Sequence, residues 1–268
     1  MNLLVAGHDR VDAGKTTFST GLLSKLDATG FKPRAGNDYW FDHGDYRRAV
    51  ESGRLYGKDA KRLAAASSAD VEPEAINPVH RLWRPDASTG PGILGPGDRS
   101  FVVDRVGAEF VVNARADVPD SAREHLPLAD ATTVSSLEEL NDVMERRHVP
   151  ALRDLAATIA ETPTAVVESY SDVALPIRGV PFAAVAVVGP ERASIYDGAR
   201  YAKACEVASG RVTDGRLEQR TRDVTDLLDP VTTASLPALT SAERSDAAAV
   251  GRAYEPAYDS LLSVARAQ

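Results

Sequence analysis

The first 26 residues join a short apolar run, a glycine-bounded loop and an amphipathic segment, and this order strongly constrains the fold. Residues 3–6 are wholly apolar, which is typical of a buried parallel strand. Residues 16–26 place their apolar side chains on one helical face, and Gly30 stands where a helix commonly ends. The segment therefore predicts a strand, a loop and a helix at the start of an α/β fold.

The loop reads Gly7-His-Asp-Arg-Val-Asp-Ala-Gly-Lys-Thr-Thr17. A Gly-Lys-Thr sequence at a helix start is typical of a phosphate-binding loop, because backbone N–H groups and the positive helix end face the anion. In such a loop Lys15 reaches the β- and γ-phosphates, and the Thr16 hydroxyl binds Mg²⁺. We predict that a nucleoside triphosphate is bound by Gly7, Asp12, Ala13, Gly14, Lys15, Thr16 and Thr17.

The glycine spacing of this loop departs from the usual pattern. A glycine is expected at position 9, where this chain has Asp9, and Gly7 lies two residues further back. A chance Gly-Lys-Thr at a helix start is the alternative interpretation. The preceding apolar strand and the following amphipathic helix provide the required context, so we favour the binding loop.

The composition limits the class of protein. Of 268 residues 43% are hydrophobic, which is enough for a sizeable core, and the net charge is −8. Few of the basic residues are lysine, which favours a halophilic source, with GC-rich codon bias as the alternative. The acidic balance argues against nucleic acid as the main partner. No signal peptide or membrane-spanning run is recognised, so a cytoplasmic protein without a membrane partner is expected.

Apolar runs alternate with helical patterns along the rest of the chain. This predicts an α/β fold with a mostly parallel sheet and helices on both faces. We expect a single domain over residues 1–268, with room for an inserted hairpin or loop region at 85–130. Strands are expected at 31–36, 101–103, 110–112, 164–168 and 180–188, and helices at 46–52, 58–66, 137–162 with a break near Pro150, 195–209 and 242–267.

Four stretches, in this order, resemble dethiobiotin synthetase and its relatives, which use ATP to activate carboxylates and amines. The chain also resembles an archaeal group of predicted P-loop ATPases and GTPases, which is the nearer of the two. The matching stretches are the loop at 7–17, one residue longer than in the synthetases; Lys32-Pro33-Arg34-Ala35-Gly36, like a lysine-proline-x-x-glycine strand end; Lys58-Asp59-Ala60 with Asn77-Pro78, like a serine-aspartate-alanine helix followed by asparagine-proline; and the strand 165–168 ending in glutamate.

The resemblance implies a three-layer P-loop NTPase fold and a role for each matching residue. Lys15 and Thr16 would hold the phosphates and the metal. Asp59 and Glu168 would be further Mg²⁺ ligands, and such oxygen groups suit this hard cation. Lys32 would be catalytic, stabilising an acceptor intermediate near the γ-phosphate. A homodimer with the site near its interface is also implied.

Other roles compete for several of these residues. Residues 100–104 form another apolar run that ends in a carboxylate, so Asp104 is an alternative metal ligand, ranked second to Glu168. Glu168 could instead cap a helix, while Asp59 and Lys32 could lie on solvated surfaces. A carboxylate at the carboxyl end of an α/β strand faces the ligand crevice, which favours the functional role of Glu168.

The acceptor is expected to be a small molecule. Residues 36–43 gather aromatics, a histidine and aspartates after the Lys32 strand, and we predict substrate contacts from Asn37, Asp38 and Tyr39. The alternative is a loop whose aromatics cover the sheet end. Where the synthetases have glycines after the strand glutamate, this chain has Ser169-Tyr170-Ser171-Asp172. The acceptor pocket therefore differs, and dethiobiotin synthesis itself is not expected.

The leading hypothesis is an Mg²⁺-dependent enzyme that hydrolyses ATP, or GTP, to drive ligase- or kinase-like activation of a small carboxylate or amine. A regulatory GTPase or ATPase switch that acts through partner binding is the alternative. A polynucleotide kinase is a third hypothesis, disfavoured by the acidic composition. No Asn/Thr-Lys-x-Asp guanine-reading segment is recognised, which favours ATP. Cys205, the one cysteine, is expected to be buried and structural.

Overall fold

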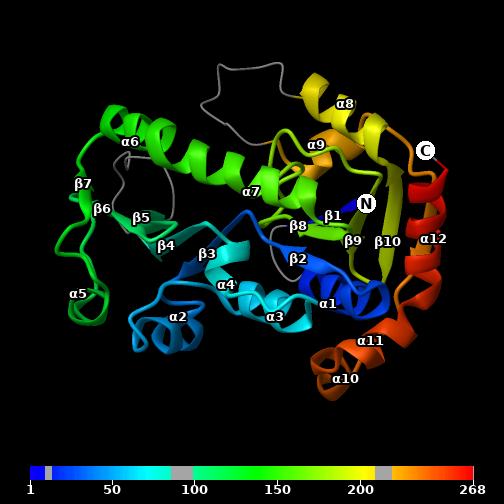
Figure 1. Cartoon of the computed structure of the whole chain (residues 1–268), viewed down its shortest axis with the longest axis horizontal. Helices are drawn as coiled ribbons and strands as arrows, with labels where there is room; N and C mark the ends of the chain where they lie inside the picture. Colours follow the sequence, from blue (N-terminus) through cyan, green and yellow to red (C-terminus); the bar gives the residue numbers. More distant parts are fainter. Residues whose placement is uncertain (10–13, 86–98, 209–218, 268) are drawn as a thin grey trace. The chain divides into compact units, whose positions relative to one another are not determined.

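The chain folds into an α/β protein (Figure 1). The computed structural model describes residues 1–9, 14–85, 99–208 and 219–267. They form two compact units, which are described separately. One unit contains Met1–Pro33, Arg62–Val71 and Ala156–Gln268, and the other contains Arg34–Lys61 and Glu72–Leu155. The second unit takes in more of the chain than the insertion expected at 85–130, and whether both units act as one domain stays a prediction.

The first unit contains sheet A, with the strand order β11-β10-β9-β1-β8-β2 among the described residues. Neighbouring strands from β9 to β2 are parallel, whereas β10 and β11 add an antiparallel edge. The predominantly parallel part of the sheet confirms the predicted fold class. The strands are β1 (Asn2–Gly7), β2 (Thr29–Phe31), β8 (Ala165–Glu168), β9 (Ala184–Gly189), β10 (Arg192–Asp197) and β11 (Thr232–Ser235).

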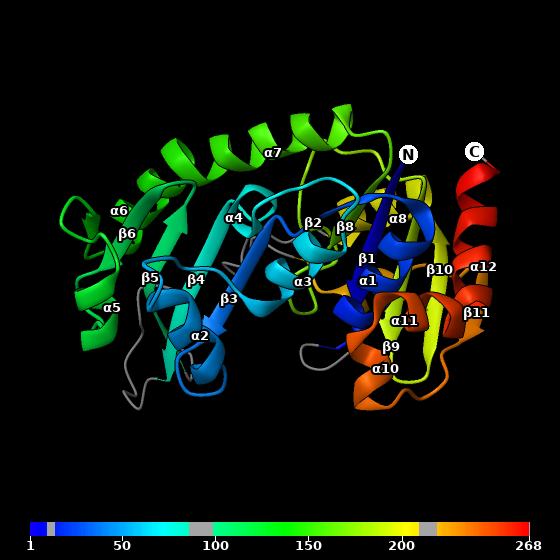
Figure 2. The ribbon, with the colours of Figure 1, turned by 60° about the horizontal axis from the view of Figure 1, so that its bottom comes forward.

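Helices cover both faces of sheet A (Figures 1 and 2). The helices α1 and α12 pack together on one face through the rings of Phe18 and Tyr258, whose centroids are 4.8 Å apart. The helix α8 contacts β9 and β10 from the other face. The helices are α1 (Lys15–Leu26), α8 (Gly198–Ala208), α9 (Thr221–Thr225), α10 (Ser241–Ser245), α11 (Ala247–Ala253) and α12 (Glu255–Arg266).

The strand β1 is at the centre of this unit. Leu3, Leu4 and Val5 are completely buried, because neighbouring strands flank β1 and helices cover both faces of the sheet. Full burial stabilises each such side chain by about 1.5–3 kcal/mol relative to water. An apolar run without alternation is therefore what this central position requires.

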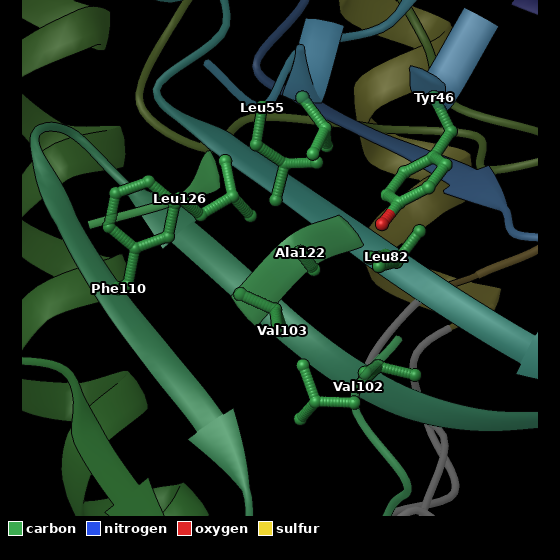
Figure 3. Packing of buried hydrophobic residues seen from close by; sticks show 10 residues of the cluster. Tyr46, Leu55, Leu82, Val102, Val103, Phe110, Ala122 and Leu126 are labelled. Atoms are coloured by element: carbon green, nitrogen blue, oxygen red, sulfur yellow. The ribbon is translucent and has the colours of Figure 1, made fainter. Parts of the chain in front are cut away.

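The second unit contains sheet B, with the strand order β3-β4-β5-β6-β7 among the described residues. The strands β5 and β6 form the hairpin that their two apolar runs allowed. Tyr46, Leu82 and Val103 belong to a buried cluster that joins this sheet to its helices (Figure 3). The elements are β3 (Arg34–Asp38), β4 (Val79–Pro85), β5 (Arg99–Val106), β6 (Glu109–Asn113), β7 (Thr132–Val134), α2 (His43–Val50), α4 (Pro73–Ile76), α5 (Asp120–His125), α6 (Leu137–Val143) and a π-helical turn, η1 (Met144–His148).

Two further helices, α3 (Lys58–Ala66) and α7 (Val149–Glu161), run across the divisions between the units. The predicted strand at 31–36 is wrong as one element, because β2 ends before Lys32-Pro33 and β3 begins after it in the other sheet. Proline fixes φ and lacks an N–H donor, so a break here is expected. Gly30 does not end α1: Asp27, with φ 49°, follows the helix, and Gly30 lies in β2.

Three predicted helices differ in detail. Residues 195–197 belong to β10, because pairing with β9 overrides their local preference. The break near Pro150 is the π-helical turn η1 rather than an end of the helix. Residues 242–267 fall into three helices, since Asp246 caps α11 and Pro256 lies in the first turn of α12. Residues 86–98, part of the region at 85–130 where an inserted hairpin or loop was expected, lie outside the described residues.

Among the described segments, no helix combines the length and apolar character needed to cross a membrane.

Candidate functional site

Three neighbouring parallel strands of sheet A end at the same edge. The register pairs Val5 of β1 with Glu168 of β8, and Phe31 of β2 with Val167 of β8. The loop after β1, the carboxylate that ends β8 and the lysine that follows β2 therefore leave the sheet together. This carboxyl edge is where α/β sheets bind ligands.

The described end of the loop after β1 enters α1 through Gly14. Gly14 has φ 79°, a left-handed conformation that disfavours residues with a Cβ, and it brings no side-chain acceptor to the first turn of α1. No acidic side chain lies in that turn. The backbone N–H groups at the start of α1 thus meet an anion without a competing carboxylate from their own turn.

Lys15 bends back over the start of the loop. Its ammonium donates to the backbone oxygen of Ser171 at 2.8 Å. A Cβ added to Gly7 would lie 2.5 Å from the Lys15 Nζ and 3.0 Å from that oxygen, so Gly7 leaves the space in which the ammonium lies. Ser171 has φ 52°, an uncommon conformation for a residue with a side chain. Ser171, which lies in the stretch where the synthetases have glycines, therefore supplies a backbone acceptor for Lys15.

Glu168 joins the predicted metal ligand and the predicted catalytic lysine. Its Oε1 accepts a hydrogen bond from the Thr16 hydroxyl at 2.9 Å and forms an ion pair with the Lys32 ammonium. Glu168 is completely buried, and Lys32 is only 3% exposed. Among the described residues Glu168 Oε2 has no hydrogen-bond partner. An unsatisfied buried carboxylate oxygen beside a hydroxyl is the donor chemistry that Mg²⁺ prefers, so Thr16 and Glu168 fit this ion.

The structure does not test most of the other predicted loop and metal residues. Asp12 and Ala13 lie outside the described residues, and Thr17 is buried in α1. Asp59 belongs to the other compact unit, so its role as a ligand stays a prediction. Within the described parts of the chain, no group of three or more His, Cys, Asp or Glu side chains could hold a metal. A magnesium ion at this edge would therefore be held by Thr16, by Glu168 and by oxygens of the bound nucleotide or of water.

The predicted substrate residues lie in the second unit. Asn37 is buried, and its amide donates to Asp45 Oδ2 at 3.0 Å. Asp38 accepts hydrogen bonds from the next turn, the closer from Trp40 N at 2.9 Å, and the ring of Tyr39 packs edge-on against Tyr46. These contacts give all three residues structural roles, and their contact with a substrate stays a prediction.

Asp104, the alternative candidate for a metal ligand, is surrounded by protein groups. It is completely buried in sheet B, where Arg81 donates two hydrogen bonds to it at 2.6 Å. His148 Nε2 lies 2.9 Å from Oδ2, the carboxylate oxygen that also accepts one of the hydrogen bonds from Arg81. Burial alone would raise the pKa of Asp104, but the charge and hydrogen bonds of Arg81, with a smaller contribution from His148, lower it below its usual value. Asp104 is held ionised by protein groups.

The asparagine-proline motif also has a structural role. Asn77 is completely buried, and its backbone oxygen accepts from the Arg105 guanidinium at 2.5 Å. Arg105 is itself buried among backbone carbonyls, including that of Leu55. Burial lowers the pKa of Arg105 to about 10. This role cannot be recognised from the local sequence, because nothing in the pattern indicates which carbonyls surround an arginine.

We expect Cys205 to be unreactive in the folded protein. It is only 2% exposed, and burial raises the pKa of its thiol to about 12, so hardly any thiolate forms at neutral pH. At pH 8 a thiol reagent such as DTNB should label it only after denaturant is added. Rapid stoichiometric labelling of the native protein would contradict its structural role.

Comparison with models of known protein families finds no match. Comparison with curated proteins finds no relative either. The function is therefore inferred from the geometry of this edge of sheet A.

Proposed function

We propose that the protein binds a nucleoside triphosphate, with ATP favoured, together with Mg²⁺ at the start of α1. Its cleavage would drive ligase- or kinase-like activation of a small carboxylate or amine. The observation that carries this proposal is the meeting of Lys15, Thr16, Glu168 and Lys32 at the carboxyl edge of β1, β8 and β2. These groups supply phosphate-binding cations and oxygen ligands for a metal. The kinship with P-loop NTPases of the dethiobiotin synthetase kind, a cytoplasmic location and a homodimer are part of the same proposal.

Each residue would have a distinct task. The first-turn N–H groups of α1 and the Lys15 ammonium would bind the phosphates, with Lys15 exchanging the Ser171 oxygen for a phosphate oxygen. Thr16 and Glu168 would hold Mg²⁺, which supplies neutralisation of the phosphate charge when bound. Lys32 would stabilise negative charge on the transferred phosphoryl group or on the acceptor.

Replacement of Lys15 by alanine tests the binding site. We expect the folded wild-type protein to bind ATP or GTP only with Mg²⁺, measured by calorimetric titration in high-salt buffer. The variant should bind at least about tenfold more weakly, since a charge-assisted hydrogen bond contributes about 1.5–3 kcal/mol. Lys25→Ala is the matched control, because Lys25 lies at the other end of α1 and pairs with Glu255 and Asp259.

The same titration has outcomes that reject the proposal. If the folded wild-type protein bound neither nucleotide, the unusual loop around Asp9 would not function as a phosphate site. Equal binding by wild type and Lys15→Ala would place the nucleotide elsewhere. If binding is observed, hydrolysis that accelerates when a small carboxylate or amine is added supports the enzyme. Partner affinity that differs between triphosphate and diphosphate states supports the regulatory switch instead.

A further inference from the structure

The two carboxylate oxygens of Glu168 differ in their hydrogen-bond partners. Thr16 and Lys32 both contact Oε1, while Oε2 has no partner among the described residues. The carboxylate is completely buried, so a nearby cation offsets the water that its charge has lost. In the protein described here, the Lys32 ammonium is such a cation.

We propose that Lys32 occupies the cation position at Glu168 until Mg²⁺ arrives with the nucleotide. Lys32 is then a positioning residue for the metal site, because its ammonium holds the Glu168 carboxylate in place in the metal-free protein. The proposal rests on the proposed function and adds a role that the sequence did not predict for Lys32. It makes metal binding conditional on nucleotide binding.

Electrostatic repulsion sets the Lys32 ammonium against a divalent cation at Glu168. Both Thr16 and Lys32 direct their polar groups to the same oxygen, so a divalent cation bound to Thr16 and Glu168 would lie close to the ammonium. Like charges in a buried site repel strongly, because little water screens them. Mg²⁺ alone would therefore have to overcome this repulsion or displace the ammonium from Glu168. A nucleotide supplies phosphate oxygens to which the displaced ammonium can turn.

Metal binding without nucleotide tests this arrangement directly. Mn²⁺, as a paramagnetic substitute for Mg²⁺, would be titrated into wild type and Lys32→Met, with bound metal measured by electron paramagnetic resonance. We expect Lys32→Met to bind Mn²⁺ at least tenfold more tightly than wild type. Lys32→Arg, which keeps the cation, and Lys25→Met, which removes a part-exposed lysine at the other end of α1, should resemble wild type. The double variant Lys32→Met/Glu168→Gln should lose the gain.

Two results would overturn the proposal. One is Mn²⁺ affinity in Lys32→Met equal to that of wild type. The other is an equal gain in Lys25→Met, which would show a general effect of lost positive charge. Because no nucleotide is present, these outcomes are separate from failure of nucleotide binding, which the Lys15→Ala titration reports.

A measurement on the wild-type protein covers the case in which Lys32→Met fails to fold. Buried, ion-paired ammonium groups exchange slowly with water, so the Lys32 Nζ signal should be visible in spectra of protein labelled with ¹⁵N-lysine. Magnesium with nucleotide should shift this signal, and saturating Mg²⁺ alone should do so less. If nucleotide binds with Mg²⁺ and the Lys32 signal is unchanged, Lys32 is not displaced and the proposal is wrong.

Discussion

Replacing Gly198 by alanine is expected to unfold the first unit or destabilise it by more than about 4 kcal/mol, at the extreme of single-substitution effects. Gly198 begins α8, and an added Cβ would lie 1.7 Å from the Phe182 carbonyl oxygen and 2.5 Å from its carbon. Both are backbone atoms, so no side-chain rotation relieves the overlap. The change is measured by urea unfolding followed by far-ultraviolet circular dichroism.

Gly44→Ala provides the matched control for this prediction. Gly44 lies in α2, and nothing lies within 4 Å of an added Cβ. Alanine there should stabilise the protein by about 0.5–1 kcal/mol, since glycine loses more conformational entropy in a helix. If the free energy of unfolding of Gly198→Ala were within about 1 kcal/mol of the wild-type value, the close approach of Gly198 to the Phe182 backbone would be wrong.

Asp104→Ala is expected to destabilise the protein by about 3–5 kcal/mol, because it removes a completely buried carboxylate and breaks its ion pair with the part-buried Arg81 guanidinium. Urea unfolding at neutral pH measures the loss. Asp259→Ala removes a carboxylate whose side chain is 63% exposed in its pair with Lys25, and it should cost no more than about 1 kcal/mol. Similar losses in both variants would contradict the buried network.

The sign of the pH dependence follows from the lowered pKa of Asp104. Its contribution is fully present above the unfolded value of 3.8, where the carboxylate is ionised in both states. It disappears as the pH falls through the lower folded value and the native carboxylate takes up a proton. The stability difference between wild type and Asp104→Ala should therefore stay constant from pH 7 to about 5 and decrease only in stronger acid.

Local patterns predicted those parts of the fold that local chemistry decides. The apolar run at 3–6 and the amphipathic helix after the loop lie where the sequence indicated, in β1 and α1. The strand β10 was missed, because its helix-like residues become extended only by pairing with β9. Such tertiary pairing cannot be read from a window of the chain.

The candidate site shows the same limit. Lys15, Thr16, Lys32 and Glu168 were recognised individually, but the ion pair of Lys32 with Glu168 depends on β8 lying beside β2. At Asp104 the local pattern suggested a ligand site, whereas the structure has an ion pair with Arg81. An apolar run ending in aspartate suggests a ligand edge, yet β5 continues to Val106 and pairs Asp104 with Arg81 across the sheet. The strand's real end, rather than its last apolar residue, decides whether a carboxylate meets a ligand.

The position of β8 between β1 and β2 has a consequence for biosynthesis. Lys32 and Glu168 are separated by 136 residues along the chain, and Thr16 and Glu168 by 152. Closing a loop of that length costs about 4 kcal/mol of chain entropy. The strand β8 can join β1 and β2 only after residues 165–168 have been synthesised. Under the proposed function, an emerging polypeptide would carry the loop after β1 early but lack Glu168. A fragment truncated before β8 should then fail to bind nucleotide with Mg²⁺, although it contains Lys15 and Thr16.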